Sequence, residues 1–290
     1  MRDLYTPSSR QIVLILKRYL FGIVLFVGLA EPVLAQSVAL KRNQTVRNQN
    51  LSKNWTVPFS FETESSTHQE WSYERTSSST ISLSPSYFWG PSLRISGNLG
   101  LTKEHSGVGD TNFNNSSLGI NYLIPASSQL SWMMGTSAII PTNPQEREEK
   151  SYQGAVRLSG GFSFSEIWKG SRLSYRLILG RNFHGYSQGA DGSYNLRQSL
   201  THSLDYLQPM GSKFSVSTVF QYTQASTYLD DLRFSFLAMA DLAFDFSESL
   251  AISVGTANQG SALRPNGRDS NVEFFNDESS IVKIGITYVL

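Results

Sequence analysis

The sequence contains no cysteine, and its 290 residues carry few charges. Without cysteine the chain is neither a disulfide-stapled small domain nor a thiolate metal protein. Charged residues make up 16%, below the rough quarter of soluble proteins. The formal net charge of +1 provides no bulk field to attract a nucleic acid or an acidic partner. Phosphate loops, nucleotide fingerprints, zinc spacings and calcium loops are also missing, so we predict no cofactor and no metal.

Long apolar runs are scarce, and the one near the N-terminus is best explained as a targeting signal. Lys17-Arg18 precede the apolar run Tyr19–Ala30, and Val33 and Ala35 stand at the −3 and −1 positions of a cleavage site. This is the layout of a secretory signal, and the run is too short to span a bilayer as a helix. We predict residues 1–35 as a signal peptide, with a retained membrane anchor as the alternative. Cleavage leaves a net charge of −1.

Alternation of apolar and polar residues is abundant. In the stretch Ile81 to Leu101, apolar residues recur at alternate positions on both sides of a Gly90-Pro91 turn, which is typical of a β-hairpin. The pattern recurs and predicts twelve strands. Besides the two strands of this hairpin, they are Trp55–Thr63, Asn115–Ile124, Gln129–Ile140, Tyr152–Phe164, Ser171–Phe183, Tyr194–Tyr206, Lys213–Thr223, Leu232–Phe246, Leu250–Ala257 and Ser280–Leu290. Because Pro58 lacks a ladder donor, ten strands are the alternative.

The connections between these segments alternate in length. Short turns such as Pro125–Ser128 alternate with long polar loops such as Pro141–Ser151 and Asn258–Ser279. Short turns on one rim and long loops on the other are typical of bacterial outer-membrane barrels. Residues 36–54 are polar and show no apolar period, so we predict a flexible periplasmic lead-in there and the barrel over 55–290.

The character of the two faces separates a membrane barrel from a soluble one. One face carries the bulky apolar and aromatic residues, and the other is mostly Ser, Thr, Asn, Gln and Gly with scattered charge. A soluble barrel of this size should bury its bulk and expose its charge. Aromatic residues also gather near the strand ends, as two girdles at the water–lipid interfaces require. The predicted fold class is therefore an all-β, antiparallel transmembrane barrel, with a soluble barrel as the alternative.

The last segment resembles the C-terminal strand of Gram-negative outer-membrane β-barrels. Val282, Ile284, Ile286, Tyr288 and Leu290 form one alternating face that runs to the end of the chain. In that superfamily the final residue is usually aromatic, so Leu290 is a departure. The resemblance covers the whole predicted barrel as a pattern and identifies the superfamily only. It implies location in the outer membrane, contact with its lipid, and a barrel assembly machinery as partner during biogenesis.

Residues in the polar phase should line the lumen. The charged residues among them are Arg94, Arg157, Arg176, Arg197, Arg233, Lys283, Glu62, Asp205, Asp241 and Asp245. Because Arg157, Arg176 and Arg197 lie on three consecutive segments, we expect them to form one basic wall, with the acidic side elsewhere. Opposed charges across a narrow bore focus a transverse field on passing solutes. The alternative is that the charges pair and plug the modest bore of a twelve-stranded barrel.

These features predict a small porin-like diffusion channel for small polar or anionic solutes, with a mild anion preference. Twelve-stranded members of the superfamily include channels for acidic sugars lined by arginines, to which the basic wall is similar in kind. The alternatives are a plugged structural or adhesive barrel whose surface loops are contact sites, and a lipid-modifying enzyme similar to outer-membrane phospholipases. The oligomeric state does not follow from these residues.

The enzyme alternative depends on the four histidines. His68, His105 and His184 fall in predicted loops, where solvation is the simplest role. His202 lies in a predicted strand with an outward phase, and Thr218 is the nearest plausible hydroxyl. A nucleophile needs a base within hydrogen-bond reach, and no partner Asn is evident. We therefore assign no catalytic residue. The connection Asn258–Ser279 is expected either to fold into the barrel mouth or to project as a contact surface.

Overall fold

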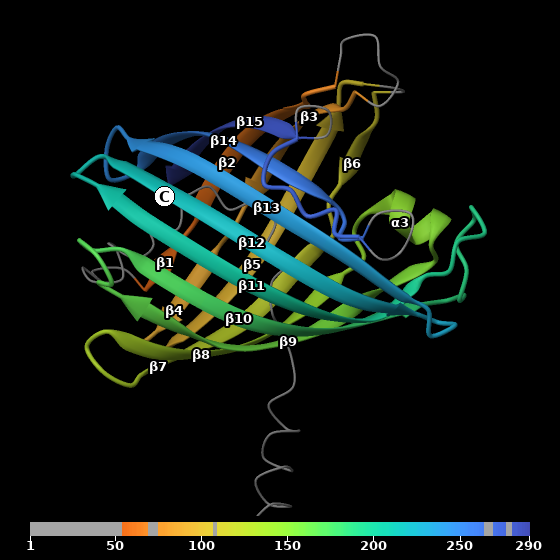
Figure 1. Ribbon diagram of the computed structural model, residues 1–290, viewed down its shortest axis with the longest axis horizontal. Coiled ribbons are helices and arrows are strands. Elements are labelled where there is room, and N and C mark those ends of the chain that lie inside the picture. The colour runs from red at the N-terminus through yellow and green to blue at the C-terminus, as the bar shows by residue number, and fades with distance from the viewer. Residues whose placement is uncertain (1–53, 69–74, 107–108, 264–268, 277–279) are drawn as a thin grey trace, which may run out of the picture.

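The protein is a closed antiparallel β-barrel whose wall has twelve strands (Figure 1). The computed structural model describes residues 54–68, 75–106, 109–263, 269–276 and 280–290. The predicted signal peptide, 1–35, and the lead-in, 36–54, lie outside these residues except for Asn54. No helix in the described ranges is long and apolar enough to cross a membrane.

The strands follow one another around the barrel in chain order. They are β1 (Trp55–Thr56), β2 (Pro58–Ser66), β3 (Ser77–Leu83), β4 (Ser86–Trp89), β5 (Leu93–Glu104), β6 (Thr111–Phe113), β7 (Ser116–Pro125), β8 (Leu130–Ile140), β9 (Tyr152–Ser165), β10 (Arg172–His184), β11 (Leu196–Met210), β12 (Phe214–Thr227), β13 (Leu232–Asp245), β14 (Leu250–Ser261) and β15 (Ile281–Val289). The helix α3 (Pro144–Glu149) lies between β8 and β9. Hydrogen bonds between β15 and β2 close the barrel.

Fifteen strand segments make twelve wall strands because β1 with β2, β3 with β4, and β6 with β7 each form one interrupted strand. The break between β3 and β4 falls at Ser84-Pro85, where a straight strand was predicted. The neighbouring strand is interrupted at the same level, and the N–H of Ser84 donates to the carbonyl of Pro58 at 2.9 Å. Pro58 is the first residue of β2, a position that strands tolerate for proline. The prediction of twelve strands is confirmed.

Several strands extend beyond their predicted ends toward the long-loop rim. β2 continues to Ser66, and β12 continues to Thr227, which shortens the predicted loop Gln224–Asp231 to residues 228–231. Backbone hydrogen bonding continues there although the apolar alternation has stopped. Above the apolar belt, outward side chains no longer need to be apolar, so the sequence pattern ends before the strand does.

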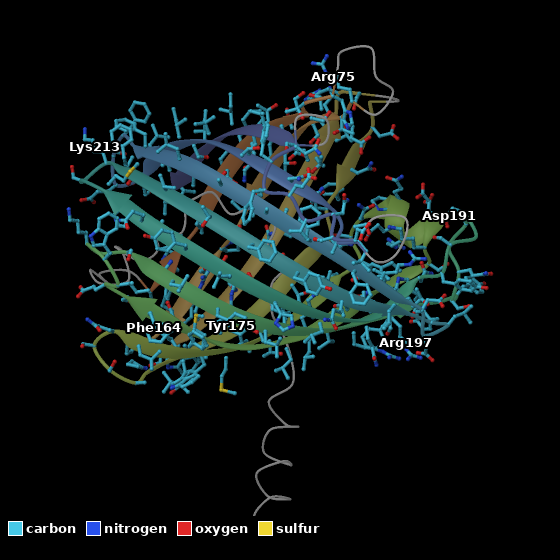
Figure 2. All side chains as sticks on the ribbon, viewed as in Figure 1. Arg75, Phe164, Tyr175, Asp191, Arg197 and Lys213 are labelled. Atoms are coloured by element: carbon cyan, nitrogen blue, oxygen red, sulfur yellow. The ribbon has the colours of Figure 1, made fainter. Side chains whose placement is uncertain are left out.

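The outward side chains form a continuous apolar surface. Trp132, Leu179 and Ile284 are 49%, 50% and 51% exposed. Figure 2 places Phe164 near the short-turn end of the barrel, opposite the long-loop end marked by Asp191. Soluble monomers rarely leave such a surface uncovered, whereas lipid acyl chains would cover it. The structure therefore has the outward apolar face predicted for a transmembrane barrel.

The described part of the β14–β15 connection lies against the outside of the barrel. The Phe274 ring lies 5.9 Å from that of Phe220, and the side-chain amide of Asn258 donates to the Glu273 carbonyl at 2.8 Å. Phe220 and Asn258 are in the outward phase of β12 and β14, since both are in register with Ala238. Residues 269–276 thus neither enter the mouth nor project freely, and both expectations for this connection were wrong for its described part.

Candidate functional site: the inner wall

The inner wall is formed by the inward phase of each strand, which is mostly polar but carries a buried apolar cluster at Val219, Met239 and Ala257. Strand register carries one inward row from Arg157 on β9 across Gly180 on β10 to Ser199 on β11. Another row runs from Asp241 on β13 across Gly255 on β14 to Lys283 on β15. Because side chains alternate between the two faces, these rows fix which charges share the interior.

Three arginines lie along β10 on the inner wall. Arg172 and Arg176 belong to β10 itself. The guanidinium of Arg157 reaches over β10 from β9, because a Cβ added at Gly180 would stand 2.7 Å from its Nη1 atom. The three groups thus occupy every fourth residue of β10, and four residues of a strand span about 13 Å. We call this row the β10 arginine ladder.

One carboxylate accompanies the ladder. Asp205 on β11 is in register with Ser174, between Arg172 and Arg176, and its Oδ2 lies 3.1 Å from Nη2 of Arg176. The Arg176 and Asp205 side chains keep 27% and 14% of their surface exposed. Since both face the interior, the lumen at this level has space for solvent.

Arg197 does not join the ladder. The register of β11 shifts between Leu196 and Gln198, so Arg197 sits at a β-bulge near the long-loop rim (Figure 2). Its guanidinium pairs with Asp230, in the short connection after β12. A bulge re-aims a side chain locally, and the alternation of β11 gives no sign of it. The expected wall of three arginines thus contains Arg157 and Arg176 but places Arg197 at the rim.

A second charged region lies on β13, β15 and β2. Nζ of Lys283 is 2.9 Å from Oδ1 of Asp241, and both side chains are almost fully buried. Glu62 and Glu64 share the inward phase of β2, in register with Gly285 and Lys283. Three carboxylates thus accompany one cation here, so this side of the lumen is net acidic.

The basic and acidic regions face each other. β10 and β2 are six wall strands apart in either direction around the twelve-strand barrel, and Figure 1 shows them on opposite sides. The β10 arginine ladder therefore lies across the lumen from Glu62 and Glu64. This geometry produces a transverse field in the bore.

The remaining predicted lumen charges lie apart from both regions. Arg94, near the short-turn end of β5, donates to the Ser86 hydroxyl from Nε at 3.2 Å and from Nη2 at 2.9 Å. Arg233 is exposed near the long-loop end of β13, and Asp245 is the last residue of that strand. None of these three joins the ladder or the acidic region.

Sequence reasoning did not select two of these inner-wall charges. Arg172 shares the even-numbered phase of Arg176, so the alternation of β10 could have identified it. Glu64 shares the phase of Glu62 but was assigned to a loop, because the apolar pattern of β2 stops before the strand ends. The register that brings Arg157 onto Gly180 has no signal in a single sequence.

The loops at the long-loop rim are bonded to one another. The buried side chain of Asn195 donates to the carbonyls of Lys150 and Tyr186, each at 3.0 Å. In the same region the Asp191 carboxylate accepts bonds from the hydroxyl and the N–H of Ser193, which hold the pKa of that carboxyl below its usual value. These contacts order the entrance above the β10 arginine ladder.

His202 and His105 each lie beside a hydroxyl group. Nδ1 of His202 lies 2.8 Å from the Tyr175 hydroxyl on the outer wall, so its partner is a tyrosine on β10 and not Thr218 on β12. Nε2 of His105 lies 2.8 Å from the Ser79 hydroxyl, and the residue is exposed, as expected for a solvated side chain. Among the described residues, no group of three or more His, Asp and Glu side chains could hold a metal ion.

Comparison with known proteins supports the fold. No protein-family model and no curated protein matches the sequence. An outer membrane channel from Pseudomonas putida F1 is similar in structure, with a TM-score of 0.60 and 11% identity over 83% of this chain and 97% of that one. The NanC porin has a TM-score of 0.52 and 11% identity over 80% of this chain and 98% of that one.

The chain therefore has the fold of outer-membrane β-barrels, and no specific family is identified. With its apolar outer face, this fold is consistent with the outer membrane of a Gram-negative bacterium, the location that the sequence predicts.

Proposed function

We propose that this protein is an outer-membrane diffusion channel for small polar solutes, with a mild preference for anions. The observation that carries the proposal is the β10 arginine ladder, which lines the lumen opposite a net acidic wall. Each guanidinium of the ladder offers an anion a place to pause, and about 13 Å separate successive groups along the strand. Sites that are weak and repeated favour conduction, because a solute can both enter and leave.

The magnitude of the selectivity follows from the geometry. Two unit charges about 4 Å apart interact by roughly 4 kcal/mol at an effective dielectric constant near 20. Water in the bore and salt reduce this strongly. A remaining difference of about 1.4 kcal/mol would still change permeability tenfold. Asp205 and the acidic wall oppose the ladder, so the preference should be mild.

A plugged structural or adhesive barrel is the alternative, and one observation favours it. Lys283 and Asp241 pair and are almost fully buried, as the parts of a structural core would be. The partly exposed side chains of Arg176 and Asp205 support the channel instead. A barrel that conducts ions in planar bilayers would exclude the plugged form.

We propose further that the protein is not an enzyme. The hydrogen bond between Ser79 and His105 resembles a nucleophile with its base. Within the described ranges, no side chain bonds the second ring nitrogen of His105, so the group that orients the base in a triad is missing. Ser79→Ala should leave phospholipid hydrolysis at the background of a protein-free sample. Hydrolysis by the wild type that this substitution removes would establish an enzyme.

Single-channel recording in planar bilayers tests the channel. Replacing Arg157, Arg172 and Arg176 together by Ser should move the reversal potential toward cations and leave a folded, heat-modifiable barrel, since lumen changes tune selectivity more than stability. Arg197→Ser is the matched control, because its guanidinium pairs with a rim loop. A wild type without conductance, or an unchanged reversal potential in the triple variant, would refute the proposal.

A further inference from the structure

Several inner-wall glycines lie beneath polar side chains of neighbouring strands, among them Gly135, Gly180, Gly255 and Gly285. A Cβ at Gly180 would meet Oγ of Ser199 and, at 2.7 Å, Nη1 of Arg157, and one at Gly285 would meet Oγ of Ser253 at 2.8 Å. At Gly135 it would meet Oγ of Ser159 at 3.1 Å as well as the Asn121 amide. Gly255 lies in the same way beneath Asp241. A Cβ closer than 3.0 Å to another atom requires one of the two groups to move. The polar side chains thus occupy the space that a residue larger than glycine would take.

The pattern follows from the register. Gly135 is flanked on its row by Asn121 and Ser159, and Gly180 by Arg157 and Ser199. In each row the polar side chain crosses the glycine and reaches toward the strand beyond it. Nη1 of Arg157 donates to the Ser199 hydroxyl at 3.4 Å, two strands from its own. Such side chains lie flat along the wall and do not point toward the barrel axis.

We propose that these glycines are positioning residues that set the bore and the charge selectivity of the channel, with Gly180 holding the Arg157 guanidinium against the wall. The inference rests on the proposed channel function. Without the Gly180 space, the guanidinium must leave the wall and stand in the lumen. It would then narrow the path and act on passing ions at shorter range.

Gly180 and Gly135 are the two positions where the proposal can be tested cleanly. At both, the atoms that a new Cβ would meet are side-chain atoms, which can move, whereas Gly255 would also meet the Ala240 carbonyl at 2.7 Å. The side chains above the two glycines differ in charge, because an arginine lies over Gly180 and an asparagine over Gly135. Gly160, with no neighbouring atom within 4 Å of its Cβ position, lies on the lipid-facing phase of β9 and is a matched control.

Single-channel conductance and reversal potential should be measured for wild type and for Gly180→Ala, Gly135→Ala and Gly160→Ala. We expect Gly180→Ala to lower the conductance and shift the reversal potential toward anions. Gly135→Ala should lower the conductance without that shift, and Gly160→Ala should change neither. In an Arg157→Ser background, Gly180→Ala should no longer shift the reversal potential, because the double-mutant cycle removes the group through which it acts.

The outcomes separate this inference from the function on which it rests. The inference is overturned if the wild type conducts and Gly180→Ala, shown to be folded by heat-modifiable migration, has the same conductance and reversal potential. That result leaves the channel function intact. A reversal-potential shift that persists in the Arg157→Ser background overturns it as well. A wild type that does not conduct overturns the channel and this inference with it.

Discussion

Asp241 and Lys283 form a buried ion pair across an intervening strand, with 2.9 Å between Oδ1 and Nζ. Asp241 lies on β13 and Lys283 on β15, and Gly255 between them leaves room for the carboxylate. Burial costs both ions their hydration, so the pair is not necessarily a net gain in stability. The pair matters because each buried charge has an opposite charge beside it.

Removing one partner should therefore be costly. We expect Lys283→Ala or Asp241→Ala to lower the free energy of unfolding by about 3–5 kcal/mol, because an uncompensated buried charge remains. The measurement is urea unfolding in detergent, followed by heat-modifiable migration. The double variant should recover part of the loss, and strictly additive losses would show that the two charges do not interact.

The acidic wall should oppose the arginine ladder. Replacing Glu62 and Glu64 together by Gln removes the acidic side chains from the inner face of β2 and should increase anion preference. We expect about a twofold change in the permeability ratio, equal to roughly 0.4 kcal/mol. Reversal potentials in a salt gradient measure it. A shift toward cations would show that these carboxylates do not act on the permeating path.

The Arg197–Asp230 pair should contribute little to stability. Asp230 is 72% exposed, and exposed ion pairs are worth about 0–1 kcal/mol. Asp230→Asn should accordingly lower the free energy of unfolding by less than about 1 kcal/mol, and added salt should leave this difference small. A loss as large as that of Lys283→Ala would mean that the rim carries more of the fold than its exposure indicates.

The last strand should be required for assembly. β15 pairs with β14 on one side and with β2 on the other, so deleting Val282–Leu290 opens the barrel and leaves two unpaired edges. Lipid does not tolerate such edges. The truncated protein should be degraded or remain in the periplasm, as fractionation and surface labelling would show. Normal surface assembly of the truncated chain would contradict both the closure and the predicted C-terminal signal.

The outer-wall connection should depend on Asn258. Its amide bonds the Glu273 carbonyl at 2.8 Å and is 3% exposed, so Asn258→Ala leaves a carbonyl without this donor. The loss should be about 1 kcal/mol, enough to raise protease cleavage within residues 269–276 severalfold. Unchanged cleavage would indicate that other contacts hold the segment.

The sequence predicts the barrel well because lipid on one side and polar lumen on the other impose a period of two on every strand. Tyr288, Ile286 and Ile284 show this period plainly, and the structure confirms the twelve strands that it indicates. Strand ends beyond the apolar belt are harder to predict from the sequence, since residues around Glu64 and Ser66 need not alternate with apolar ones.

The inner wall is only partly predictable, because alternation gives the face of a residue but not its level or its partner. Arg157 and Arg176 have the predicted inward phase, yet their shared place on β10 depends on register. The bulge at Arg197 removes it from that row without changing the sequence pattern. The pairing of Asp241 with Lys283 likewise requires the order of three strands and a glycine between them.

The position of the β14–β15 connection changes how the chain can be engineered. Exposed loops usually accept an epitope tag or an inserted domain. Residues 269–276 instead lie on the outer wall, where the Glu273 carbonyl accepts a hydrogen bond from the Asn258 amide and the Phe274 ring contacts Phe220. A tag placed there would break both contacts, and the loss of the hydrogen bond alone should cost about 1 kcal/mol. An insertion in the connection between β10 and β11 would likewise have to keep the bonds from Asn195 to the carbonyls of Lys150 and Tyr186, which order the entrance.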